Sequence, residues 1–336
     1  MTPHAEFAVH ESSQVGAARR HAADLSTRMG FDAVAAGRLA IVVTELGNNL
    51  VQHAREGRLL LACSRPGEPR GIEVISLDSG PGIADVERCM TDGFSTGGTP
   101  GGGLGSVRRL SQGFGVFSKP GGGTVIVGRV AASSAARPPA PAEALPELAG
   151  LCLAAPGESV SGDSWAASLS RTRSRVIVAD GLGHGPDAGA AADAAIAVFE
   201  AAPDSDPAEV LTQAHAALRG TRGAAVAIAC CDAERDRVTL YGAGNISSRL
   251  ISGTQDRSLM TQHGTVGLQM RQVQPVAQAW PEHALLVLHS DGITTRWNLD
   301  DVPGLLRCSA IVVAAWILHT QRRGRDDATV VVLRRR

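Results

Sequence analysis

The chain has 336 residues, of which 44% are hydrophobic and 19% are charged, and its formal net charge is −1. This composition is typical of folded globular proteins and argues against long disordered regions. A net charge so close to zero produces no overall field that would attract nucleic acid or an anionic membrane, so we expect neither as a partner. At about 100–200 residues per domain, the length predicts two domains.

The same sequence favours a cytoplasmic protein. The first residues, MTPHAEFAVHESS, lack the apolar core of a secretion signal. The longest apolar helix-like run, 311–318, is much shorter than the ~20 residues that cross a bilayer. The six cysteines are scattered without a CxxC pair, which favours reduced thiols over a disulfide framework or a zinc site.

A boundary is predicted at 131–147, AASSAARPPAPAEALPE, which is rich in alanine, proline and serine and has no apolar periodicity. Prolines at this density do not fit inside a helix or a central strand, so we interpret the segment as a semi-extended linker. It separates a domain at 1–130 from one at 148–336. Both halves alternate helix and strand signals, so we expect a mixed α and β fold in each.

In the first half, 33–54 is predicted to be a helix, because apolar residues recur at spacings of three and four. The alternating segment 71–77 is predicted to be a strand that ends at Asp78. A glycine-rich stretch follows at 93–105, a helix is expected to open at 107–110, and 124–130 is expected to be a closing strand.

In the second half, strands are predicted at 175–179, 224–231, 238–241, 284–289 and 329–333, with the second and third forming a hairpin. Helices are predicted at 187–202, which is rich in alanine, and at 309–319.

Three polar residues of the first predicted helix share one face. Glu45, Asn49 and His53 are spaced by four, which stacks them turn over turn. A carboxylate and an amide together suit a magnesium-bound phosphate tail, because the amide oxygen is a hard ligand and the carboxylate can deprotonate an attacking group. A solvated helix face is the alternative interpretation.

Two further motifs follow. DSGPGI at 78–83 comes directly after a strand, where a carboxylate can accept a hydrogen bond from an exocyclic amine such as that of adenine. GFSTGGTPGGGLGSVRRL at 93–110 offers backbone N–H groups to an anion, and the next helix start adds a favourable dipole. Each motif alone is weak evidence for a nucleotide site.

Together and in this order, the helix, DSGPGI, the glycine-rich lid and GGGTVIV resemble the GHKL ATP-binding fold shared by gyrase, heat-shock protein 90, histidine kinases and MutL. Residues 35–130 are most similar to the RsbT type of bacterial serine kinase. The resemblance implies an α/β sandwich that binds ATP with Mg²⁺. By this resemblance, Asn49 would bind the metal and Glu45 would be the catalytic base. Asp78 and Thr124 would contact adenine, and Gly80 and Gly82 would shape the pocket for the base. The phosphates would be wrapped by Gly101, Gly103 and Gly105.

The second half carries acidic motifs at predicted strand or turn edges: SGD at 161–163, DGLGHG at 180–185, SDG at 290–292 and DDAT at 326–329. One such motif alone is ordinary turn chemistry. Several carboxylates can converge in a buried site only if cations neutralise them, and oxygen ligands select hard ions such as Mg²⁺ or Mn²⁺. Two such ions about 3.5–4 Å apart can activate a water for attack on phosphorus.

VADGLGHGPDAGAAADAA, YGAGNIS, HSDGITTRW and RDDATVVVL resemble, in order, the SpoIIE and RsbX branch of the metal-dependent type 2C (PPM) protein phosphatases, over residues 150–335. The resemblance implies an α-β-β-α sandwich. Its ligand set for two Mn²⁺ or Mg²⁺ ions is Asp163, a bridging Asp180, the Gly181 carbonyl, Asp291 and Asp326, with Asp327 as the neighbouring alternative. His184 has two open roles, phosphate contact or turn stabilisation.

The two resemblances imply a bifunctional bacterial regulator. Its phosphatase half would act on phosphoserine or phosphothreonine of a STAS-domain anti-sigma-factor antagonist or stressosome protein, and its first half would act as a serine kinase. The alternative is a phosphatase whose first half only binds a partner or senses ATP.

Overall fold

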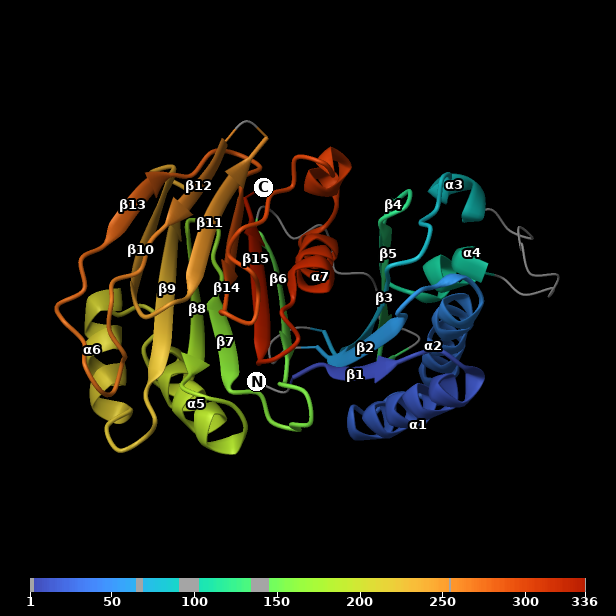
Figure 1. The fold of residues 1–336 in the computed structure, drawn as a ribbon, viewed down its shortest axis with the longest axis horizontal. Coiled ribbons are helices and arrows are strands. Elements are labelled where there is room, and N and C mark those ends of the chain that lie inside the picture. The colour runs from blue at the N-terminus through green and yellow to red at the C-terminus, as the bar shows by residue number, and fades with distance from the viewer. Residues whose placement is uncertain (1–2, 65–68, 91–102, 134–144, 254, 336) are drawn as a thin grey trace. The chain divides into compact units, whose positions relative to one another are not determined.

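The computed structural model describes residues 3–64, 69–90, 103–133, 145–253 and 255–335. It divides into two compact units, shown in Figure 1. The N-terminal unit comprises the described residues up to 133 together with Leu299–His319, and the C-terminal unit comprises the described residues of 145–298 and 320–335. Three five-stranded antiparallel sheets with flanking helices confirm the mixed α and β class.

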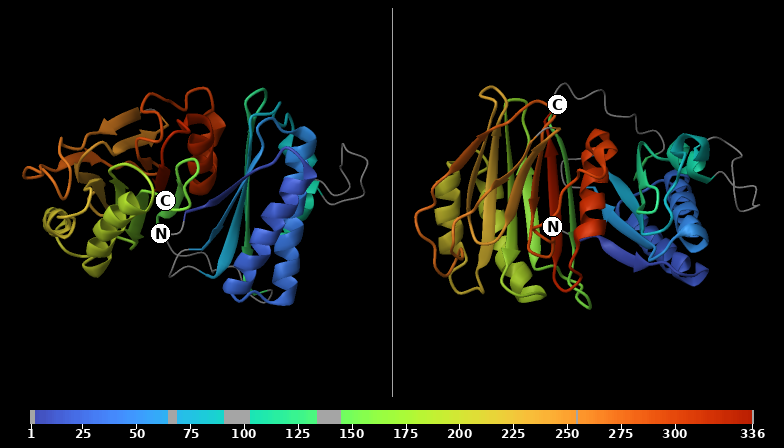
Figure 2. Two further views of the ribbon diagram at one scale, coloured as in Figure 1. Left: turned by 60° about the horizontal axis from the view of Figure 1, so that its bottom comes forward. Right: turned by 45° about the horizontal axis from the view of Figure 1, so that its top comes forward.

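The N-terminal unit is built on one sheet with the strand order β1-β2-β3-β5-β4, in which all neighbours are antiparallel. Helices α1, α2 and α4 cover one face of it, as Figure 2 shows for α1 and α2. The bounds are β1 (Ala5–Ala8), α1 (Ser12–Arg28), α2 (Ala33–His53), β2 (Arg58–Cys63), β3 (Gly71–Asp78), α3 (Val86–Cys89), α4 (Gly103–Leu110), β4 (Gly113–Lys119) and β5 (Gly123–Ala131).

Helix α2 confirms the predicted helix and forms the centre of this layer. Its first turn is capped by Asp32, whose carboxylate accepts a hydrogen bond from Ala35 N at 2.7 Å. Its apolar side packs with Leu61 and Val74 of the sheet in one buried core. By length and apolar composition α2 could also cross a membrane. Its buried face is what the core helix of a folded domain needs.

The other face of this sheet is covered by a helix from far along the chain. Register places Phe117, Val125, Leu77 and Arg58 in one row across the strands. Helix α7 (Ala310–Gln321) contacts both ends of that row. The Trp316 ring packs edge-on against Phe117, with centroids 4.8 Å apart, and His319 Nδ1 lies 3.0 Å from an Arg58 guanidinium nitrogen.

The 3₁₀ helix η1 (Pro303–Arg307) precedes α7 in the same segment. Nearby, an ion pair joins Lys119 of β4 to Asp301. The segment Leu299–His319 therefore groups with the N-terminal sheet in one compact unit. The domain bounds at 1–130 and 148–336 stay a prediction.

The C-terminal unit holds two sheets, ordered β13-β10-β9-β8-β7 and β12-β11-β14-β15-β6. Their strands are β6 (Glu147–Leu153), β7 (Asp163–Ser168), β8 (Arg173–Gly181), β9 (Ala224–Asp232), β10 (Arg237–Ala243), β11 (Ser247–Ser252), β12 (Gln255–Leu259), β13 (Val276–Ala279), β14 (Leu285–His289) and β15 (Ala328–Arg334). Helices α5 (Pro186–Ala201) and α6 (Pro207–Ala217) pack on the first sheet.

Side chains of β8 alternate between two buried cores, which places this strand between a helix layer and the second sheet. Val176 and Val178 point into the core that both sheets share, with Leu286 and Val331 from the second sheet. The intervening residues, including Ile177, point to the core beneath α5 and α6. One helix layer and two sheets of the expected α-β-β-α sandwich are therefore present in this unit, whereas α7 groups with the N-terminal unit.

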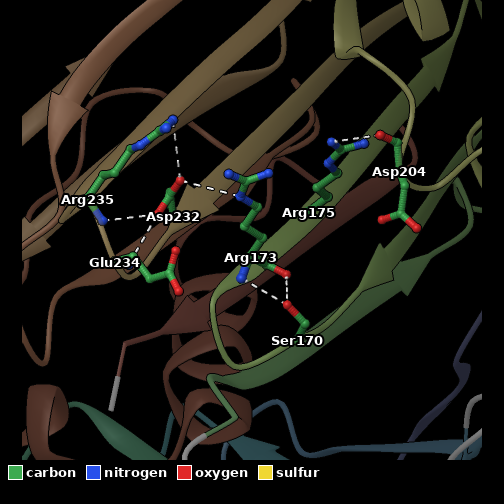
Figure 3. A network of polar contacts seen from close by, with 7 residues as sticks. All are labelled: Ser170, Arg173, Arg175, Asp204, Asp232, Glu234 and Arg235. Atoms are coloured by element: carbon green, nitrogen blue, oxygen red, sulfur yellow. Dashed lines mark hydrogen bonds and ion pairs between the residues drawn. The ribbon is translucent and has the colours of Figure 1, made fainter.

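A polar network secures one end of the first sheet (Figure 3). Asp232 at the end of β9 pairs with Arg173 at 3.5 Å and accepts a hydrogen bond from Glu234 N. Arg175 donates to the Asp204 carbonyl at 3.2 Å. Arg173 and Arg175 lie at the start of β8, whereas Asp180 lies near its end. The network therefore fixes turns at the end of the sheet that is far from the predicted phosphatase centre.

Candidate nucleotide site and carboxylate centre

Asp78 lies at the end of β3, and its Oδ1 accepts a hydrogen bond from Gly80 N at 2.7 Å. Thr124 of β5 is its register partner. The Thr124 hydroxyl is 2.9 Å from the Ser118 hydroxyl, which also accepts a hydrogen bond from Ile83 N at 2.7 Å. The structure thus brings Asp78 and Thr124 together and adds Ser118, which no sequence motif indicated.

The Asp78 carboxyl is partly exposed, and burial raises its pKa, while the Gly80 N–H and the charge of His53 lower it. Gly82 has a positive φ of 72°, and a Cβ there would lie 2.3 Å from the Lys119 carbonyl oxygen. Only glycine fits this approach of the DSGPG turn to the β4–β5 turn.

The polar face of α2 reaches the same turn. Ser79 N donates to the Arg55 carbonyl at 2.9 Å, so the DSGPG turn is held against the C-terminal end of α2. His53 lies at that end, with Asn49 one turn earlier and Glu45 two turns earlier. Asn49 and Glu45 are partly exposed, which leaves both side chains accessible to a ligand.

The glycine-rich lid is described only in part. Gly103 begins α4 with a φ of 45°, and Gly105 is buried within that helix. Gly101 lies outside the described residues. The helix begins four residues earlier than the predicted start at 107, and Leu104 and Val107 anchor it in the core.

In the C-terminal unit, Asp163 and Asp180 face each other as register partners on β7 and β8. Asp163 is only 4% exposed. Gly181 follows at the end of β8, and its N–H donates to the Gly162 carbonyl at 3.0 Å. The structure therefore brings together the first two predicted ligands and fixes the peptide whose carbonyl is the third.

The other acidic residues come from the second sheet. Asp291 follows β14, and Asp326 and Asp327 precede β15, its antiparallel neighbour. A Cβ at Gly292 would lie 1.9 Å from the Asp327 carbonyl oxygen, so glycine is required for the two loops to meet.

Each of three carboxylates has one oxygen held by a protein donor. Ser290 Oγ donates to Asp163 at 2.6 Å, Asn245 Nδ2 donates to Asp291 at 2.8 Å, and Ala155 N donates to Asp327 at 2.8 Å. Asn245 and Ser290 were not predicted as site residues, although the YGAGN and SDG motifs contain them.

The carboxylates repel one another. Burial raises the pKa of Asp180 well above its usual value, and the charges of Asp163, Asp291 and Asp326 raise it further. Burial also raises the pKa of Asp163 to about 7. Burial is the main cause of the raised pKa of Asp291 and of Asp327 as well. This electrostatic strain disfavours a fully ionised centre without cations.

The donor set fits hard divalent cations, since it consists of carboxylate oxygens and a backbone carbonyl. Within the described ranges, no three His, Cys, Asp or Glu side chains already form a closed ligand cluster. Asp327 is buried and bonded to Ala155 N, whereas Asp326 is partly exposed and its charge acts on Asp180. This difference favours Asp326 over Asp327 as the ligand.

His184 has a partner outside its own loop. Its Nδ1 lies 2.8 Å from a carboxylate oxygen of Glu158. Of the two roles left open by the sequence, this contact favours stabilisation of the DGLGHG turn.

Comparisons with known proteins relate each half of the chain to a family. The family described as "Histidine kinase-like ATPase domain" matches residues 9–128. The serine/threonine-protein kinase RsbT of Bacillus subtilis (strain 168) is 36% identical over 98 residues, which is 29% of this chain and 74% of RsbT. The chain belongs to the RsbT family through its N-terminal domain.

The second half of this RsbT-family chain is a SpoIIE-type phosphatase domain, since the family "Stage II sporulation protein E (SpoIIE)" matches residues 170–336. A solved structure described as "The bacterial stressosome: a modular system that has been adapted to control secondary messenger signaling" is 29% identical, with a TM-score of 0.53. It aligns with 57% of this chain and 100% of its own.

The structure of RsbX in complex with magnesium has a TM-score of 0.50 at 21% identity, over 58% of this chain and 96% of RsbX, which shows a shared fold. The predicted families and enzyme class are therefore confirmed: a serine/threonine phosphatase domain is joined to an RsbT-like, kinase-type ATPase domain, the organisation of a bifunctional regulator of partner-switching signalling.

Proposed function

We propose that the C-terminal unit removes phosphate from a serine or threonine of a STAS-domain anti-sigma-factor antagonist or stressosome protein. The divalent cations, two Mn²⁺ or Mg²⁺ ions, would be held by Asp163, Asp180, the Gly181 carbonyl, Asp291 and Asp326. When bound, the ions supply an activated water for attack on phosphorus.

One observation carries this proposal. Carboxylates from both sheets meet in a largely buried centre and raise one another's pKa. The charges of three neighbouring aspartates raise the pKa of Asp180, in addition to the effect of its burial. A folding domain that bears this cost needs cations to relieve it, and oxygen donors select hard ones. RsbX, which shares the fold, was solved with magnesium.

The chain's own residues would prepare the centre. Ser290 orients the Asp163 carboxylate, and Asn245 orients that of Asp291. Both donors leave the second carboxylate oxygen available to a cation. The register between β7 and β8 keeps Asp163 and Asp180 opposite each other, so both can serve a shared site.

For the N-terminal unit we propose binding of ATP with Mg²⁺ and phosphorylation of serine. Asp78 would accept a hydrogen bond from the adenine amine, with Thr124 beside it in register. Asn49 would bind the magnesium ion, and Glu45, one turn earlier on the same face of α2, would accept the proton of the attacking serine.

The RsbT relationship supports the proposed partner class, and we expect both reactions to occur in the cytoplasm. The test is to mix the purified chain with candidate STAS-domain proteins, with and without ATP and Mn²⁺, and to read phosphorylation by intact mass. We expect a gain of one phosphate with ATP and its loss from the phosphoprotein with Mn²⁺.

Absence of any mass change on every candidate would contradict the partner class. A loss of phosphate without any gain would contradict the kinase reaction and favour the alternative, in which the N-terminal unit only binds a partner or senses ATP.

A further inference from the structure

A guanidinium close to the carboxylate centre can hold a phosphoryl group, and three arginines in the neighbouring loops differ in the contacts that they make. Arg222 pairs with Asp187 at 3.0 Å. Arg322 donates to the Ala154 carbonyl at 3.3 Å. Arg323 is exposed, and among the described residues its guanidinium makes no hydrogen bond or ion pair.

The backbone holds Arg323 beside the SDG turn. Its N–H donates to the Gly292 carbonyl at 2.8 Å, and the preceding residue forms a β-bridge with Ile293. This short ladder fixes the main chain of Arg323 next to Asp291, which leaves only the side chain free to reorient.

Arg323 lies between two of the proposed metal ligands along the backbone. Asp291 directly precedes the Gly292 whose carbonyl accepts the Arg323 N–H, and Asp326 follows Arg323 by three residues. In the described part of the chain the guanidinium bonds to neither carboxylate.

We propose that Arg323 binds the phosphoryl group of the substrate, an inference that rests on the proposed phosphatase function. Once cations neutralise the carboxylates, the strongest remaining partner for the guanidinium is a phosphoryl oxygen. A guanidinium presents its donors in a planar fork that matches two such oxygens, which a lysine ammonium does not.

The test compares Arg323→Gln and Arg323→Lys with Arg325→Gln, a matched control. Arg325 is also exposed and close in sequence, but among the described residues its backbone makes no hydrogen bond to the SDG turn. Binding of inorganic phosphate to the Mn²⁺-loaded full-length protein is measured by calorimetry, alongside KM and kcat for a phosphoserine peptide and Mn²⁺ affinity without phosphate.

We expect Arg323→Gln to weaken phosphate binding and to lower kcat/KM by about 10- to 100-fold, because a charge-assisted hydrogen bond is lost. Arg323→Lys should recover part of this loss, and Arg325→Gln should resemble the wild type. Mn²⁺ affinity should be retained in all variants.

Unchanged phosphate binding in Arg323→Gln would overturn the inference, as would an equal loss in Arg325→Gln, which would indicate only a general surface field. If the wild type binds Mn²⁺ and phosphate but has no phosphatase activity, the proposed function fails, while the calorimetry still decides the role of Arg323.

Discussion

Asp163 shows how a single side chain links the fold to the chemistry. It is buried, bonded to Ser290 and close to the charges of Asp291 and Asp327, and its pKa of about 7 is well above that of an unfolded chain. The folded state therefore binds this proton more tightly. The resulting stabilisation is complete below about pH 4 and is lost as the pH rises through 7.

We predict that the metal-free protein loses stability between about pH 4 and pH 7 relative to Asp163→Asn, by up to about 4 kcal/mol. The asparagine keeps an acceptor for Ser290 but cannot ionise. Urea unfolding of both proteins in chelator would measure the difference. Burial lowers the pKa values of His289 and His319, so their titration changes stability with pH in the opposite direction. Both histidines are present in the two proteins, and subtracting one unfolding free energy from the other therefore cancels their effect. If the unfolding free energies of the two proteins changed with pH in the same way, the raised pKa of Asp163 would be contradicted.

Asp78 carries the corresponding prediction for the nucleotide. Asp78→Asn should weaken ATP binding by about tenfold or more, because the amide can present a donor where adenine needs an acceptor. Asp24→Asn, an exposed change on α1, is the control. Titration calorimetry with Mg²⁺-ATP on the full chain would measure both, and equal affinity of the Asp78 variant would exclude Asp78 from recognition.

At the scale of elements, α7 was predicted from its apolar run, but its packing was not. Nine of its residues are buried, which indicates a helix covered on all sides, yet a sequence cannot say by which strands. Here Trp316 contacts Phe117 of the N-terminal sheet. The domain bounds drawn at the linker of 131–147 stay a prediction, because composition indicates where a chain is extended and not which distant segments pack together.

Trp316→Ala should therefore destabilise the N-terminal unit by about 3–5 kcal/mol. Native-state hydrogen exchange of β3 and β5 amides would report that unit separately. Ile41→Ala, at a residue 46% exposed on α2, should have little effect. Unchanged exchange in the tryptophan variant would show that α7 does not support this sheet.

Other elements show why prediction succeeded or failed. Helix α2 was found because large apolar residues recur on one face, whereas α1 was missed because its buried face has only one valine and one leucine beside two alanines and a serine. The acidic residues were found because each follows or precedes an apolar strand. Asn245 was missed because it bonds to Asp291, 46 residues away in the chain, and Arg323 because its backbone bonds to Gly292, 31 residues away.

At the scale of the molecule, the N-terminal unit contains a segment from each side of the linker. We predict that a chain cleaved after residue 140 still elutes as one species in gel filtration, because Leu299–His319 remains packed on the N-terminal sheet. Turnover of a small aryl phosphate should persist. Separation into two fragments under native conditions would contradict this account of the unit.

The central claim is that the aspartates gathered from two sheets form a metal-dependent phosphatase centre. The direct measurement is hydrolysis of an aryl phosphate as a function of Mn²⁺ concentration by the wild type, Asp180→Asn and Asp291→Asn. We predict saturable, metal-dependent activity in the wild type and its loss in both variants, since each change removes ligand charge from the centre. Wild-type rates in either variant, or activity that persists in chelator, would contradict the claim.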